Sequence, residues 1–128
     1  MFEGEKIPGP IGKYSQVRVV PLGSAKMLFV SGMATVGEYD HDIEAQSEAI
    51  FRRMDTLLKE HDASLANLVK ITAFLADIRG EYQKYNAVRN RVFANIDPPP
   101  ASSSVGITMN LNADLRIEID GIAIVPAR

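Results

Sequence analysis

The sequence predicts an α/β two-layer sandwich in which two helices pack on one face of a mixed β-sheet. Two segments carry apolar residues at the helical period, and shorter segments rich in β-branched and aromatic residues alternate like strands. Their order is β-β-α-β-α-β-β, which favours two helices on the same side of the sheet. The 128 residues are expected to form one domain, spanning 1–128.

The clearest strand is the last one, residues 115–125, which read LRIEIDGIAIV. Strand side chains alternate between two faces, so one face here is wholly apolar and is expected to pack on the helices. The other face starts charged and turns apolar at Ile122 and Ile124, which is unusual for a face in water. It carries two carboxylates, Glu118 and Asp120. This pattern predicts a strand that lines a cleft, lies at a subunit boundary, or both.

The remaining elements follow in order. Residues 1–13 are rich in Gly and Pro and predict an extended arm. Strands are expected at 14–20, 27–31, 69–76 and 102–108. Asp42 is a credible N-cap for a first helix whose apolar stripe includes Ile50 and Met54, and a second helix is expected at about 80–95. The prolines at 98–100 end it.

Composition excludes several classes of site. The chain has no cysteine and two histidines, so a transition-metal site is not expected. The formal net charge is −2, and the arginines at 52, 53, 89 and 91 are expected to lie on solvent-exposed helix faces. No nucleic-acid partner is therefore expected. No apolar segment approaches the roughly 20 residues that span a bilayer. No membrane association is expected, and the default location is cytoplasmic.

Four segments carry motifs of one known family in the right order. They are GPIGKYSQ at residues 9–16, FVSG at 29–32, VKITAFLAD at 69–77 and IEIDGIA at 117–123. Together they resemble the RidA/YjgF reactive-intermediate deaminase superfamily. The resemblance implies a homotrimer of chorismate-mutase-like subunits, with a small-molecule substrate in clefts between subunits. It also implies cofactor-free hydrolysis of imines or enamines with release of ammonia.

The resemblance also implies site residues. Tyr14, Ser31 and Asn86 match positions that line the family's cleft. Asp120 matches the family's second strand carboxylate, one methylene shorter, and with Tyr14 is the predicted catalytic pair. In the family's P-A-R-S motif an arginine binds the substrate carboxylate, and Ser102 stands at that position here. Ser102 and Ser103 are therefore expected to form a reshaped substrate pocket, because a hydroxyl cannot replace the charged guanidinium fork.

Three functions remain open at this point. The first is an imine or enamine deaminase whose substrate specificity differs from that of the archetypal family members. The second is a trimer that binds a small ligand or a partner in the same clefts without catalysis. The third is a ribonuclease or translation inhibitor, against which the acidic charge balance counts.

Overall fold

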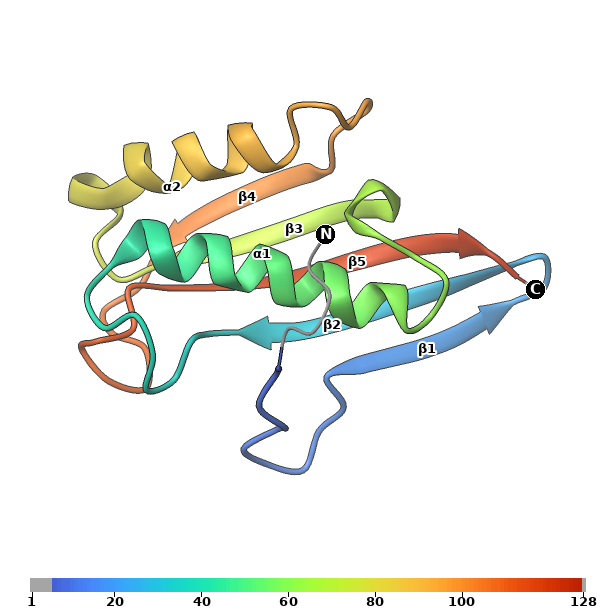
Figure 1. The fold of residues 1–128 in the computed structure, drawn as a ribbon, viewed down its shortest axis with the longest axis horizontal. Coiled ribbons are helices and arrows are strands. Elements are labelled where there is room, and N and C mark those ends of the chain that lie inside the picture. Colours follow the sequence, from blue (N-terminus) through green and yellow to red (C-terminus); the bar gives the residue numbers. More distant parts are fainter. Residues whose placement is uncertain (1–5, 128) are drawn as a thin grey trace.

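The computed structural model describes residues 6–127, which form five strands, two α-helices and a short 3-10 helix, Leu65–Asn67 (Figure 1). The elements are β1 Val17–Leu22, β2 Ala25–Met33, α1 Ile43–Lys59, β3 Leu68–Leu75, α2 Ile78–Val92, β4 Ala101–Gly106 and β5 Ile117–Pro126. The predicted order of elements is confirmed, as is the α/β class.

The strands form one mixed sheet in the order β1-β2-β5-β3-β4. Three neighbouring pairs are antiparallel, and β3 pairs with β4 in parallel, with α2 as the crossover between them. The last strand in sequence, β5, lies at the centre, between β2 and β3. Strands β1 and β4 are the two edges, so residues on them are far apart in one chain (Figure 1).

Both helices lie on the same face of the sheet (Figure 1). The Asp42 carboxylate caps α1 by accepting from the Ala45 amide at 3.0 Å, as predicted. The predicted apolar face of β5 is buried against this layer, and Phe51 of α1 meets Phe93, just after α2, edge to face at 5.4 Å. The core thus lies between the helices and one sheet face: Leu28, Ile50, Met54, Leu58, Ile71, Ile117 and Ile119 are all fully buried.

Two parts of the sequence interpretation are corrected. Strand β1 starts at Val17 rather than at residue 14, because Ser31 holds the preceding chain through its amide to Gln16 O (2.9 Å) and its hydroxyl to Ser15 O (2.5 Å). The arginines at 53 and 89 are not on solvated helix faces. Arg53 is only 4% exposed and pairs with Glu38 at 2.7 Å, and Arg89 is half-buried. A helical wheel places a residue on a face but does not show what loops or sheet edges cover that face.

The opposite face of the sheet has no helix over it. We call it the open face; it exposes apolar side chains from three strands, Phe29, Val105 and Ile124. Such a surface on a sheet of this size is typical of a protein–protein interface. Among the described helices, none has the length and apolar character needed to cross a membrane.

Candidate functional site

The side chains singled out in the sequence occupy three separate places in one chain. Tyr14 and Ser31 lie beside the N-terminal arm, Asn86 and Ser102 lie where α2 faces β4, and Ser103 and Asp120 lie on the open face. The edge strands separate the first two places, since β1 and β4 are at opposite ends of the sheet. Each place is described in turn.

The first place is a cavity of about 420 Å³ between the arm and the end of β2, which we call the arm cavity. Its walls combine apolar groups with the polar side chains of Tyr14, Gln16, Ser31, Arg53 and Glu118. Gln16 holds the arm over it by donating to Pro8 O at 2.7 Å. The Tyr14 ring is half exposed, and its hydroxyl accepts from the Ile11 amide at 3.4 Å.

Glu118 is the carboxylate that lines this cavity, whereas the catalytic carboxylate predicted from the sequence, Asp120, does not line it. Glu118 lies directly over Gly32, so closely that a Cβ on that glycine would overlap the carboxylate. Its Oε1 accepts from Asn110 Nδ2 at 3.3 Å. The alternation of the sequence places Glu118 and Asp120 on the same face of one strand. What distinguishes the two carboxylates is their neighbours on the adjacent strands.

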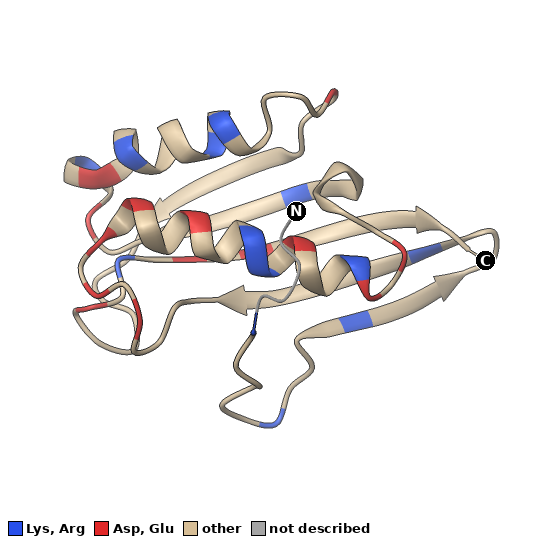
Figure 2. Cartoon of the chain, in the orientation of Figure 1, with Lys and Arg blue, Asp and Glu red and all other residues tan. Residues whose placement is uncertain are grey.

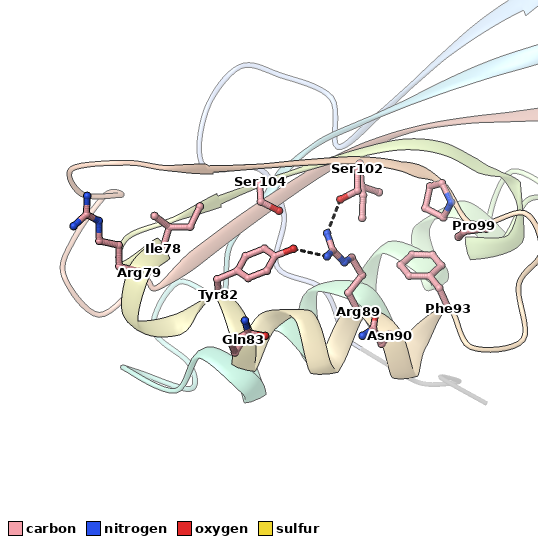
Figure 3. Close-up of a pocket in the computed structure, with 12 residues that line it drawn as sticks. Ile78, Arg79, Tyr82, Gln83, Arg89, Asn90, Phe93, Pro99, Ser102 and Ser104 are labelled. Carbon is pink, nitrogen blue, oxygen red and sulfur yellow. Dashed lines mark hydrogen bonds between the residues drawn. The ribbon is translucent and has the colours of Figure 1, made fainter.

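The second place is a hollow of about 1050 Å³, open to solvent, between α2 and the edge strand β4 (Figure 3). We call it the α2–β4 hollow. Ser102 and Ser104 line it from the strand, and Tyr82 and Arg89 line it from the helix. Arg89 joins the two sides: Nη1 donates to Ser102 Oγ at 2.9 Å, and Nη2 donates to Tyr82 Oη at 2.8 Å and to Asn86 Oδ1 at 2.6 Å.

Aromatic rings also surround the Arg89 guanidinium. Its central carbon lies 5.1 Å from the ring centre of Tyr85 and 5.7 Å from that of Tyr82. The Tyr85 hydroxyl is buried near Arg89 and Ser102 yet has no hydrogen-bond partner of normal geometry. Burial raises the pKa of the Tyr85 phenol, and the Arg89 charge opposes part of that rise.

Sequence analysis placed Arg89 on a solvated surface and so missed its position in this hollow. The spacing 82, 86, 89 puts Tyr82, Asn86 and Arg89 on one helix face, which was the available signal. What the spacing could not show is that this face looks at Ser102.

The third place is a row of polar side chains across the open face. Asp120 lies opposite Thr72, and Thr72 lies opposite Ser103. Lys70 Nζ donates to both Thr72 Oγ1 and Ser103 Oγ at 3.1 Å. Asp120 has no ion pair within residues 6–127, and neither it nor Ser103 lines the arm cavity or the α2–β4 hollow in a single chain.

Metal ligands do not gather anywhere in the described part of the chain, where no group of three His, Asp or Glu side chains could hold an ion. The three places described above bring together hydroxyls, the strand carboxylates Glu118 and Asp120, and the guanidinium groups of Arg53 and Arg89.

Comparison with known proteins identifies the family. The family model for Endoribonuclease L-PSP matches residues 4–125, nearly the whole chain. The chain belongs to this family, which includes the RidA and YjgF proteins. A RutC family protein of Pyrococcus abyssi is 33% identical over 124 residues, covering 93% of this chain and 91% of that one. The chloroplastic Reactive Intermediate Deaminase A of Arabidopsis thaliana is 29% identical over 120 residues, covering 89% of this chain and 60% of that one.

The fold is equally well matched. The crystal structure of Escherichia coli TdcF with bound serine superposes with a TM-score of 0.78 at 28% identity, covering 92% of each chain. The sheet order and the single helical layer described above are thus those of YjgF-type structures.

Proposed function

We propose that this protein is a hydrolase that deaminates a small imine or enamine, releasing ammonia without a cofactor. The observation that carries the proposal is the arm cavity, which is lined by a carboxylate, Glu118, and by the hydroxyl-bearing residues Tyr14 and Ser31. Membership in a family that includes a Reactive Intermediate Deaminase A supports the reaction class.

The reaction needs few groups. Water adds to the imine carbon, the C–O bond forms, the C=N bond opens, and the carbinolamine then collapses to a carbonyl compound and ammonia. A carboxylate that accepts a proton from the attacking water and returns it to the departing nitrogen balances the protons. We assign this role to Glu118, with Tyr14 as the hydroxyl that holds the nitrogen or the water. An enamine would first accept a proton at carbon to give the imine.

Asp120 remains a second candidate for the carboxylate. It lies on the same strand face as Glu118, two residues further toward the C-terminus, and a neighbouring subunit could cover it. The two candidates differ in surroundings, because Glu118 lines a cavity of its own chain and Asp120 does not.

We further propose that the chain acts as a homotrimer whose subunits meet at their open faces. The exposed apolar side chains of Phe29, Val105 and Ile124 would be buried there. Association would also place polar side chains of two subunits around one cleft, which a single chain cannot provide. Light scattering of Phe29→Asp and Ile124→Asp should show smaller species than wild type. A wild-type protein that is already monomeric would rule out the proposed trimer.

The test of the reaction is the rate of ammonia release from 2-iminopropionate and a panel of larger imines generated in situ. Glu118→Gln and Asp120→Asn are the matched pair, since each removes one charge from one strand face. We expect Glu118→Gln to lose roughly 10²–10⁴-fold in kcat/KM, the usual worth of a general base, with a smaller effect of Asp120→Asn. A larger loss in Asp120→Asn assigns the carboxylate role to Asp120, and full activity in both removes the mechanism.

The alternative is a trimer that binds a small ligand without turnover. TdcF, similar in fold, was solved with bound serine, so the scaffold can hold an amino acid. Saturable binding of amino or keto acids with no rate above the uncatalysed hydrolysis of any imine tested would favour this alternative.

A further inference from the structure

We propose that Arg89 of α2 binds the carboxylate of the ligand, in place of the strand arginine for which Ser102 is substituted. This inference rests on the proposed function and names the residue of this chain that would hold the ligand's carboxylate. A ligand-binding experiment tests this inference independently of whether the protein hydrolyses imines.

The first support is an uncompensated charge. Within residues 6–127 the Arg89 guanidinium has no carboxylate partner, and its side-chain hydrogen bonds to Ser102, Tyr82 and Asn86 all go to neutral oxygens. Two residues further along α2, Arg91 pairs with Glu48 at 2.7 Å and is well exposed. A half-buried cation held only by neutral groups and aromatic rings is costly unless an anion completes the site.

The second support is position. Arg89 reaches across the hollow and ends at the side chain of Ser102, so its charge lies beside the strand position where the family motif has arginine (Figure 3). Because a serine is short, it leaves room for this guanidinium and gives it an acceptor. A long side chain at position 102 would compete for the same volume.

The third support is pre-organisation with spare donors. A guanidinium has five N–H donors, and the three bonds to Ser102, Tyr82 and Asn86 use three of them. Asn86 and Tyr82 fix the plane of the group from the helix side. The remaining donors can serve a carboxylate that enters the hollow, which is lined by Ser104 and the exposed edge of β4.

A purely structural role for Arg89 is the competing explanation. It would tie α2 to β4 through Ser102, and its loss would change stability but not ligand preference. A second cation at the hollow, Arg79, is the competing ligand group. The experiment therefore has to separate charge from tethering and Arg89 from Arg79.

The experiment titrates the full chain with pyruvate and, separately, with pyruvamide, its neutral analogue, and follows the Arg89 Nε–H and Ser102 amide signals by NMR. We expect saturable binding of pyruvate and none of pyruvamide. Arg89→Gln should weaken pyruvate binding roughly tenfold to a hundredfold, the worth of a lost charged hydrogen bond. Arg91→Gln, on the same helix but outside the hollow, should bind like wild type.

The decisive variant moves the charge back to the strand. Arg89→Gln/Ser102→Arg should regain most of the affinity that Arg89→Gln loses, which a tethering role does not predict. The proposal is overturned if wild type does not bind pyruvate, if pyruvamide binds equally well, if Arg89→Gln binds normally, or if Arg79→Gln rather than Arg89→Gln abolishes binding. If the protein binds pyruvate through Arg89 but does not hydrolyse imines, that result would support this inference and rule out the proposed reaction.

Discussion

Gly32 gives the sharpest prediction about the arm cavity, because it supports the Glu118 carboxylate by having no side chain. A methyl group at position 32 would overlap the carboxylate of Glu118, whereas one at Gly9, in the same cavity wall, would meet nothing within 4 Å. Gly32→Ala should therefore displace Glu118, and Gly9→Ala should not. The pair differs only in what the added methyl touches.

The size of the effect follows from the contact. The carboxylate must retreat by about 1 Å to restore ordinary van der Waals distance, and a misplacement of that size can cost roughly a hundredfold in rate. The fold should tolerate the change, because Gly32 lies within a strand at no positive φ, and alanine regains about 0.5–1 kcal/mol of backbone entropy relative to glycine. Loss of the 3.3 Å bond from Asn110 offsets a similar amount.

The assay combines kcat/KM for the best imine substrate with the ¹³C carboxylate shift of Glu118 and the midpoint of thermal unfolding. We expect Gly32→Ala to lose about a hundredfold in rate and to shift the Glu118 signal, with its free energy of unfolding within about 1 kcal/mol of wild type. Gly9→Ala should match wild type in all three. Unchanged rate and carboxylate shift in Gly32→Ala would refute the placement of Glu118 in the working site.

Three further predictions follow. Ser102→Arg alone should lower the unfolding midpoint and gain no pyruvate affinity, since the new guanidinium meets Arg89 and like charges there repel by roughly 1 kcal/mol after solvent screening; higher affinity at unchanged stability would contradict this. Tyr85→Phe should raise the free energy of unfolding at pH 7 by about 1 kcal/mol, because it removes a buried hydroxyl that has no hydrogen bond of normal geometry. The raised pKa of Tyr85 means that only the unfolded chain loses this proton just above pH ~10, so wild-type stability should fall there and Tyr85→Phe should lack that fall in denaturant titrations. RNA should not be retained at about 0.15 M salt in filter binding, because acidic and basic residues are interspersed (Figure 2) and the net charge is −2; retention would revive a nuclease role.

The fold could be predicted because its signals are local. The alternation of residues 115–125 predicted which side chains of β5 are buried, and Asp42 predicted the start of α1. The apolar Ile122 and Ile124 predicted that this face lines a cleft or a subunit boundary. In the single chain Ile124 is exposed on that face. None of these signals needed knowledge of which strands are neighbours.

The site could be predicted only in part, because its groups meet through the sheet order. Tyr14, Ser31 and Glu118 line one cavity, and only the placement of β2 beside β5 shows which β5 carboxylate lies there. The pairing puts Glu118 over Gly32 and puts Asp120 in a row with Thr72 and Ser103. Two residues of separation on one strand face thus decide whether a carboxylate lines the arm cavity.

Arg89 illustrates the same limit at the other edge of the sheet. Read along the sequence, Ser102 is a missing arginine, and the loss of a carboxylate anchor follows. In the folded chain a guanidinium nitrogen of Arg89, from α2, lies 2.9 Å from the serine hydroxyl. Under our proposal this different element supplies the charge. A substitution in a binding motif therefore removes a function only if no neighbour supplies the same group, and for this chain the neighbour is one helix turn from Asn86. The charge at this edge, rather than the residue at position 102, is what substrate specificity should follow.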